Sequence, residues 1–340
     1  MRLISLKSLK IGERLGTGIR SQDGHILLAA RATVTEGHIN RLGSFGISTV
    51  YVEDELFDEV ELRTAITDET KTKALKAVGD VLSQINTGKS LYINTDGVKQ
   101  AAGEIAADVR KSLNYEPIGL FNTYAVTDAR ALHAVNVSCI TSALALACGC
   151  TIPAIAEYAQ AALLHDMSLG SLEFDRTDNF EHAVTAMELL KKGQKINPRT
   201  YTSVAMHHEN FDGTGKPKGV KGDSIQEGAR IISVADMYDN VVNGYAGYQK
   251  LSYNYAVEYI NSRSGIELDP KMVAHFNKNV AIYPTGATVL LNNGFKAVVV
   301  GQNENFPARP RVRLIMPNKE DCLMFNMMTH STLFIESVDL

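Results

Sequence analysis

The chain of 340 residues lacks several features that mark particular protein classes. It has four cysteines and no paired CxxC spacing, so nothing indicates a cysteine-ligated zinc site or a disulfide framework. Because Cys148 and Cys150 fall inside an apolar helical run, we expect them, with Cys139 and Cys322, to be buried free thiols. The net charge of -4 also lacks the basic excess typical of proteins that bind nucleic acid or membrane surfaces.

Long apolar segments are missing as well. The first residues, MRLISLKSLKIGERL, contain no extended apolar core, and no later segment has the uninterrupted apolar length of a membrane span. We therefore expect a cytoplasmic protein without membrane insertion. The chain has no repeat, low-complexity tract, receiver-domain acid cluster, Walker loop or DNA-reading motif, so it names no input signal and no DNA partner.

What is present divides the chain into four parts. Residues 1–65 alternate β-branched runs with glycine turns and predict a small α+β module. Residues 66–120 show one apolar helical stripe and predict a helical connector. Residues 121–282 are a series of apolar-periodic helices that form the main domain. Residues 283–340 return to strand patterns, with an Asn-Gly hairpin turn in ATVLLNNGFKAVVVG, and predict a β-rich module.

The predicted fold class is therefore mainly α, with small modules at both ends. A hydrophobic fraction of 45% is enough to fill at least one sizeable core. Within the main domain the apolar periodicity predicts helices over these residues: 132–148, 153–164, 182–190, 225–242 and 253–260. Pro153 suits the first turn of its helix, directly after Thr151.

Histidine and acid residues gather in this domain. The stretch HHENFDGTGKPKG, residues 207–219, joins two adjacent imidazoles to an acid-and-glycine loop, and an upstream His165-Asp166 pair ends an apolar helix. Neutral imidazole with carboxylate suits divalent iron, manganese or zinc. The clustering predicts a metal centre.

Taken singly, each of these residues could also have a purely structural role. His133 and His182 could be core histidines, and Asp166 could cap its helix. Adjacent side chains on a helix diverge, so the pair His207 and His208 indicates two ions. Asp236 is an acid on a mostly apolar helix, where an unpaired charge is unfavourable.

The order of these motifs resembles one family. His133, ALLHDM, His182, HHENFDGTGKPKG and ARIISVADMYD follow one another as in the HD-GYP family of bacterial phosphodiesterases, and the likeness is strongest over residues 120–280. The flanks are similar too, with SLKIGERL, DGHILL and YVEDE in front and YPTGATVLLNNGFKAVVV and NENFPARPRVRL behind. The resemblance implies an HD-type helical bundle that hydrolyses cyclic di-GMP with two, sometimes three, iron or manganese ions.

The resemblance also implies roles for individual residues. One ion would be held by His133, His165 and Asp236, and the other by the remaining three histidines, His182, His207 and His208. The catalytic Asp166 would bridge both ions, which would share a hydroxide that attacks phosphorus. A third ion would need an acid just before the first histidine, where only Asp128 is nearby and out of step.

The chain departs from the family at the substrate side. The family pattern HDxGK reads HDMSLG here, with Leu169 in the place of the lysine, and GYP reads GKP. The family's arginine in the RPY-like stretch after Asp236 is absent from NGYAGYQKLS. A shorter segment, SLEFDRTDNFE, replaces the usual loop before His182, and we expect a reshaped pocket there.

Other basic side chains could compensate for the missing lysine and arginine of the family. Lys216 at the mouth of the site and Lys250 are candidate substrate-binding residues, although the sequence alone favours solvated surface lysines for both. A basic cluster could attract an anionic dinucleotide or merely solvate a helix end: Lys191, Lys192, Lys195 and Arg199. Asp212 is expected to shape its turn rather than bind metal.

The functional prediction is a phosphodiesterase that converts cyclic di-GMP, or a related nucleotide, to pGpG or GMP in second-messenger signalling. Two alternatives stay open. The missing lysine, arginine and tyrosine fit a degenerate module that binds metal and nucleotide without turnover, and the altered loop fits an HD hydrolase of another phosphoester. A homodimer formed through the terminal modules is also open.

Overall fold

The computed structural model describes residues 1–58, 60–87, 93–114, 116–120, 124–126, 128–169, 180–192 and 196–338. The chain folds into two compact units. One contains Met1–Ala65, Tyr115–Thr127 and Val280–Leu340, and the other contains Ile66–Asn114 and Asp128–Asn279. The predicted class is confirmed, since a helical bundle is accompanied by small α+β elements and a five-stranded sheet.

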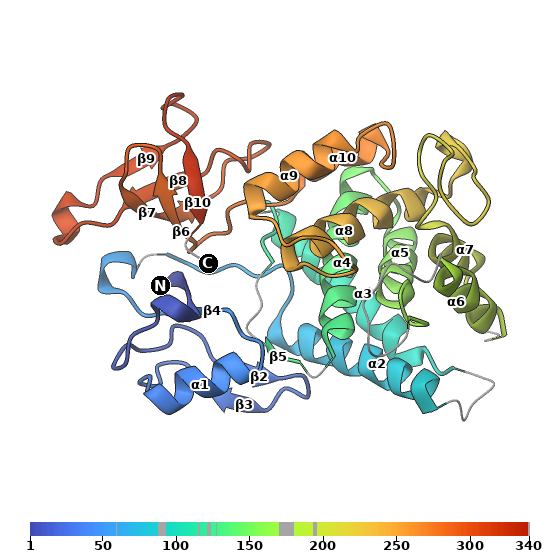
Figure 1. Ribbon diagram of the computed structural model, residues 1–340, viewed down its shortest axis with the longest axis horizontal. Helices are drawn as coiled ribbons and strands as arrows, with labels where there is room; N and C mark the ends of the chain where they lie inside the picture. The colour runs from blue at the N-terminus through green and yellow to red at the C-terminus, as the bar shows by residue number, and fades with distance from the viewer. Residues whose placement is uncertain are drawn as a thin grey trace. The chain divides into compact units, whose positions relative to one another are not determined.

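The second unit is helical (Figure 1). Its α-helices are α2 (Asp68–Thr87), α3 (Asp96–Leu113), α4 (Ala129–Ala147), α5 (Ile152–Leu164), α6 (Glu181–Lys192), α7 (Pro198–Met206), α8 (Glu227–Asn243), α9 (Tyr253–Ser262) and α10 (Pro270–Asn279). A short 3-10 helix, Gly222–Ser224, precedes α8. The stripe predicted in residues 66–120 is buried on α2, where Leu75, Val78 and Leu82 face the interior.

Helix α4 lies at the centre of this bundle. It packs against α2, α3, α5, α8 and α10, and nearly every residue from Arg130 to Ala145 is buried. By length and composition alone α4 could cross a membrane, which corrects the expectation that no segment could. However, 83% of this apolar stretch is buried inside the protein. Its apolar composition is therefore explained by the surrounding helices, since a helix enclosed by others is apolar on all sides.

Local signals explain where several helices begin and end. Thr151 is the N-cap of α5 and Pro153 lies in its first turn, as predicted. Asn197 caps α7 by accepting a hydrogen bond from the Arg199 amide, and Pro198 starts that helix. Helix α8 ends at Gly244, whose φ of 74° suits a residue without a Cβ.

The helices predicted in the main domain are present as α4, α5, α6, α8 and α9. Helices α7 and α10 were not predicted. In α7 the run PRTYTSVAM is rich in β-branched and aromatic residues with low helix propensity, and its packing against α5, α6 and α8 overrides that preference.

The first unit contains small sheets around its own core. Its strands are β1 (Arg2–Ser5), β2 (Ile19–Ser21), β3 (Ile26–Leu28), β4 (Thr49–Val52), β5 (Tyr124–Ala125), β6 (Thr288–Leu291), β7 (Lys296–Gly301), β8 (Arg311–Leu314), β9 (Met324–Asn326) and β10 (Ile335–Val338). Helix α1 (Glu36–Ser44) and the 3-10 helices Leu6–Ser8, Glu55–Phe57 and Lys319–Asp321 complete it.

The strands form three sheets. Strands β1 and β4 pair antiparallel, β2 lies between β3 and β5, and the five-stranded sheet has the order β10-β6-β7-β8-β9. The Asn-Gly turn is confirmed between β6 and β7, where Gly294 has a φ of 83° and Leu291 exchanges backbone hydrogen bonds across the turn. Strand β9 was not predicted.

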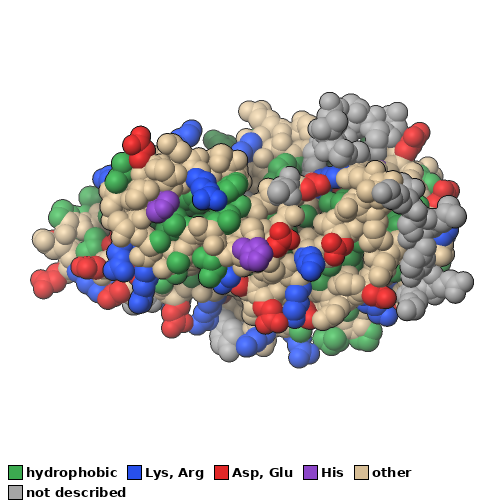
Figure 2. All heavy atoms as spheres, turned by 90° about the horizontal axis from the view of Figure 1, so that it is seen from below, with side chains coloured by type: hydrophobic (Ala, Val, Ile, Leu, Met, Phe, Trp, Pro, Cys, Tyr) green, Lys and Arg blue, Asp and Glu red, His purple; other side chains and the backbone are tan. Residues whose placement is uncertain are grey.

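The expectation of buried free thiols is met in part, and the surface charge agrees with the composition. All four cysteines are free, and Cys139 and Cys322 are buried as predicted, whereas Cys148 and Cys150 are partly exposed at the end of α4. On the face drawn in Figure 2, acidic and basic side chains are interspersed, in keeping with the small net charge.

Candidate metal centre

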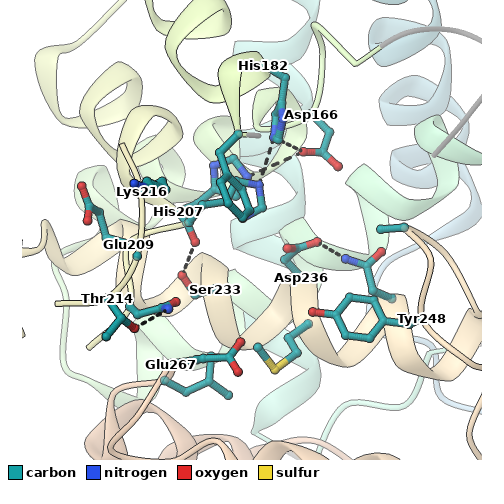
Figure 3. Close-up of a pocket in the computed structure, with 18 of the residues that line it drawn as sticks. Asp166, His182, His207, Glu209, Thr214, Lys216, Ser233, Asp236, Tyr248 and Glu267 are labelled. Atoms are coloured by element: carbon teal, nitrogen blue, oxygen red, sulfur yellow. Dashed lines mark hydrogen bonds and ion pairs between the residues drawn. The ribbon is translucent and has the colours of Figure 1, made fainter. Parts of the chain in front are cut away.

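The structure brings together all seven residues predicted as ligands. They form two groups that share Asp166, and within each group the ligand atoms lie within 4.8 Å of one another. The first group is His133, His165, Asp166 and Asp236, and the second is Asp166, His182, His207 and His208. These side chains come from α4, the end of α5, α6, the end of α7, and α8. Figure 3 labels four of them, Asp166, His182, His207 and Asp236.

The first group is compact and buried. The Nε2 atom of His133 lies 3.2 Å from Nε2 of His165 and 3.1 Å from Oδ1 of Asp236. Nε2 of His165 lies 3.4 Å from Oδ2 of Asp166. Spacings of roughly 3 Å are those between neighbouring ligands that surround one ion at about 2.1 Å.

The second group uses the other oxygen of Asp166. Oδ1 lies 3.2 Å from Nε2 of His182 and 3.6 Å from Nε2 of His207. The ring of His208 completes the group, with its Nε2 3.0 Å from Nε2 of His182. Because Oδ2 faces the first group and Oδ1 the second, Asp166 has the geometry of a bridging carboxylate.

The histidine rings are oriented by their second nitrogen. Nδ1 of His165 donates to the Ala162 carbonyl and Nδ1 of His207 donates to the Val204 carbonyl, both at 2.7 Å. A proton on Nδ1 leaves the lone pair of Nε2 directed into the group, where a metal ligand needs it.

Asp239 orients His133 and was missed by the sequence analysis. Its Oδ2 accepts from Nδ1 of His133 at 2.8 Å, while Oδ1 accepts from Asn136 at 2.9 Å and Asn243 at 3.1 Å. The available signal was its position on α8, three residues after Asp236 and hence on the same face.

The paired histidines correct one expectation. His207 and His208 were expected to diverge as helical neighbours, yet their ring centroids are only 3.9 Å apart and both belong to the second group. Helix α7 ends at Met206, with His207 as its C-cap, so the chain turns before His208 and helical divergence does not apply.

Charge in the first group must be balanced by a cation or by protons. Burial lowers the pKa of His133, but hydrogen bonds and charge from Asp236 and Asp239 raise it to about 9. Burial also opposes ionisation of Asp166, but the charge of His165 and hydrogen bonds from His165 and His182 hold its pKa well below its usual range. Buried carboxylates are unfavourable without positive charge beside them, which protons supply when no metal is bound.

The second group suits a cation for a complementary reason. Burial and the neighbouring histidines hold the pKa of His208 well below its usual value, and burial lowers that of His207. Both rings are therefore neutral, as metal ligands must be. The buried Nε2 of His207 also has no hydrogen-bond partner among the described residues. The donor set thus fits divalent iron, manganese or zinc.

A cavity opens beside the two groups. Among the described residues its lining includes ligands of both groups, the apolar or aromatic side chains Leu169, Phe180, Met237, Tyr248 and Leu268, the carboxylates Glu209 and Glu267, and Lys216. Lys216 is the one lysine or arginine among the described residues of that lining. Lys250, the other predicted substrate contact, is exposed, packs against Gly244 and lies outside it.

The substituted HD motif has a structural account. The hydroxyl of Ser168 donates to the His182 carbonyl at 2.6 Å and so ties α5 to α6. Leu169 stands in the cavity lining where the family has a lysine, and its carbonyl accepts a hydrogen bond from the buried Arg130. Arg130 is itself paired with Asp128, the N-cap of α4, so Asp128 is occupied in that pair.

The loop after the paired histidines is tightly braced. A Cβ at Gly215 would lie 2.0 Å from the Asn210 nitrogen, so this position requires glycine. The buried Glu209 accepts from the amides of Lys218 and Val220. Asp212 shapes the turn as predicted, since its Oδ1 accepts from both the amide and the hydroxyl of Thr214.

The predicted basic cluster is only partly described. Arg199 is paired with Glu157 at 2.6 Å, and the Lys191 ammonium lies over the Tyr201 ring. Lys192 is exposed at the end of α6, whereas Lys195 falls outside the described residues. Most of the replaced loop, residues 170–179, also lies outside them.

Comparison with known proteins defines the class. Residues 156–272 match the family model of the HD domain, and residues 288–339 match that of a KOW domain associated with the HD domain. The chain therefore carries an HD domain, and the predicted resemblance to the HD-GYP family is confirmed.

Particular relatives are named as follows. A cyclic di-GMP phosphodiesterase of Pseudomonas aeruginosa is 26% identical over 270 residues, which cover 74% of this chain and 64% of that protein. A 3'3'-cGAMP-specific phosphodiesterase of Vibrio cholerae is 28% identical over 151 residues, covering 40% of this chain and 32% of that one. The chain spans less than two thirds of the length of these relatives.

Among solved structures, an HDG"Y"P protein from Bdellovibrio bacteriovorus matches with a TM-score of 0.49 and 16% identity. The match covers 81% of this chain and 97% of that one.

Proposed function

We propose that this chain is a metal-dependent phosphodiesterase that hydrolyses cyclic di-GMP to pGpG or GMP. The observation that carries the proposal is the pair of ligand groups joined by Asp166 in the wall of one cavity. Relatives named as cyclic di-GMP phosphodiesterases support the choice of substrate.

The proposed cofactors are two divalent ions, iron or manganese. His133, His165 and Asp236 would hold one ion. The three histidines of the second group, His182, His207 and His208, would hold the other ion, and Asp166 would contact both. Two such ions, when bound, activate a water for attack on phosphorus and neutralise charge on the phosphate oxygens. The protein's part is to hold Nε2 of His133, His165 and His207 in place through their Nδ1 partners and to keep both carboxylates ionised.

Substrate positioning falls to the cavity wall. Lys216 is exposed and lines the cavity, so we propose it as the side chain that contacts substrate phosphate. Lys250 lies outside the described lining and is the weaker choice. Leu169, in the place of the family's lysine, contributes apolar surface instead of charge.

That replacement favours a second candidate function. A cavity with Leu169 in its wall and Lys216 as the cation in its described lining fits a module that binds a nucleotide and does not turn it over. Such a module would bind the metal ions but form no product, so an assay that measures metal content and product together separates the two functions.

The test measures metal content and turnover on the same samples. The chain, loaded with iron or manganese under reducing conditions, is expected to convert cyclic di-GMP to pGpG or GMP. Asp166→Asn should lose both ions and about 100-fold or more of the turnover, because it removes the shared carboxylate. Asp223→Asn, whose exposed side chain pairs with Arg230 away from both ligand groups, is the matched control and should retain both.

Two results would count against the proposal. Turnover by Asp166→Asn equal to that of the wild type would remove the two-metal mechanism. Tight cyclic di-GMP binding by the metal-loaded wild type without any product would select the binding module.

A further inference from the structure

The cavity has an acidic wall away from the bridging carboxylate. Glu267 lines it from the loop between α9 and α10, and Figure 3 shows its carboxylate well apart from Asp166, with Asp236 between them in that view. Tyr248 lines the same cavity from the loop between α8 and α9. A carboxylate repels phosphate, so a ligand in this part of the cavity would have to present a different group to Glu267.

Contacts connect Glu267 to Tyr248. The Arg263 guanidinium lies 4.7 Å from the centre of the Tyr259 ring and its Nη1 lies 3.3 Å from Oε1 of Glu267. The Tyr259 ring meets the Tyr248 ring edge to face at 6.0 Å. An aromatic face and a carboxylate are therefore held in the cavity by one chain of side-chain contacts.

The backbone around Glu267 is fixed as well. Its carbonyl accepts from the Phe211 amide at 3.1 Å, and the Ile266 carbonyl accepts from the Asp212 amide at 2.9 Å. These bonds join the Glu267 loop to the loop that follows the paired histidines. The carboxylate thus has a defined position relative to the second metal-ligand group.

The chemistry of a carboxylate selects what it can recognise. It only accepts hydrogen bonds, and its two oxygens offer about four acceptor sites, so the ion pair with Arg263 leaves capacity for a ligand. Guanine presents two adjacent donors, N1–H and the exocyclic N2 amino group. Adenine presents an acceptor at N1 beside its amino group, which a carboxylate repels.

We propose that Glu267 and Tyr248 form a guanine-binding subsite, in which Glu267 accepts from N1–H and N2–H of one base and Tyr248 lies against its face. The inference deepens the proposed function, on which it rests for the dinucleotide substrate. It makes Glu267 the residue that distinguishes guanine from adenine. Base stacking on an aromatic ring tolerates any base, so Tyr248 supplies affinity without that discrimination.

The test compares Glu267→Gln with the wild type on three substrates. For cyclic di-GMP, kcat/KM is expected to fall about 10- to 100-fold, because a donor amide replaces an acceptor that carries charge. For cyclic di-AMP and for bis(p-nitrophenyl) phosphate, which has no base, the change should stay within about threefold. Glu258→Gln, an exposed residue of α9, is the matched control and should leave all three unchanged.

The outcomes separate this inference from the proposed function. An equal loss on cyclic di-GMP and cyclic di-AMP would assign Glu267 to ribose or to structure, and no loss on either would remove its role; both overturn the subsite. If the wild type hydrolyses no cyclic dinucleotide, the proposed activity fails. Dissociation constants of cyclic di-GMP and cyclic di-AMP for the metal-loaded wild type and Glu267→Gln then decide the subsite. A wild type that binds neither, or binds both equally, overturns it.

Discussion

At the scale of single residues, the ligand groups depend on side chains that do not point into them. Asp239 holds His133 through Nδ1 and is itself fixed by two asparagine amides, Asn136 and Asn243. A carboxylate in this position sets the ring orientation and increases the basicity of the other ring nitrogen, which is the candidate metal ligand.

Asp239→Asn is expected to weaken metal binding by about 10- to 100-fold. An asparagine can accept from His133, but its amide nitrogen would then face the donors of Asn136 and Asn243. Chelator competition measures the change. Asp223→Asn, whose side chain is exposed and pairs with Arg230, is the control, and equal metal affinity in the two variants would contradict the role of Asp239.

The clustering of imidazoles and carboxylates predicted a metal centre, and the resemblance to the HD-GYP motif order predicted which seven side chains meet there. Asp239 was not predicted, because it matches no ligand position of that motif order and only its spacing of three residues after Asp236 placed it on the same face of α8. The placement of Lys250 relative to the cavity could not be predicted from the sequence either. Which way a loop turns after Gly244 depends on tertiary packing, and here the turn leaves Lys250 outside the described cavity lining.

At the scale of elements, the ends of helices place the ligands. His165 and His207 are the C-cap residues of α5 and α7, and each Nδ1 bonds to a carbonyl three residues earlier in its own helix. The loop after α7 then has to hold His208 in place without helical hydrogen bonds. Gly215 does this by packing directly on the backbone of His208 and Asn210.

Gly215→Ala should therefore lower the free energy of unfolding by about 1–3 kcal/mol, because the new Cβ meets backbone that cannot move independently. Metal content should fall with it. Gly103→Ala in α3, where a Cβ would meet nothing within 4 Å, should instead stabilise by up to about 1 kcal/mol. Chemical denaturation measures both, and a Gly215→Ala protein as stable as the wild type would show that the loop tolerates displacement.

Periodicity predicted long helices well and short ones poorly. Helix α4 is apolar along its whole length and α8 has clear apolar repeats, whereas α7 has nine residues with weak helix propensity. The cap signals Asn197 and Pro198 were present before α7, and they would have marked its start.

At the scale of the whole molecule, metal binding should contribute to the stability of the helical unit. Both ligand groups join helices from across that unit, so an ion binds the folded state in preference to the unfolded chain. At a free metal concentration about 100 times the dissociation constant, each ion adds about 2.7 kcal/mol.

Removing the ions with a chelator should lower the melting temperature by roughly 5–10 °C per ion lost. Asp166→Asn should melt at the same temperature with and without chelator, because it lacks the shared ligand. Differential scanning calorimetry with and without added manganese measures this difference. A wild-type melting temperature unaffected by the chelator would mean that metal is not linked to folding.

The division of the chain could not be read fully along the sequence. Residues from both ends meet in one unit, where the Leu3 amide donates to the Gly286 carbonyl and the Thr288 hydroxyl donates to the Leu3 carbonyl. A contact across this sequence distance leaves no periodic signal, so local patterns predicted the strands of each end but not their association.

Asp166 belongs to both ligand groups, so amino-acid substitutions have different consequences in the ligand groups and in the cavity wall. Any substitution that removes its carboxylate disables both ligand groups together, so neither group can be lost alone through this position. Leu169 bonds to Asp166 through the backbone, which any side chain at that position preserves. Under the proposed function, the cavity wall could therefore vary while the two ligand groups persist, and a change of substrate would need no change in those groups.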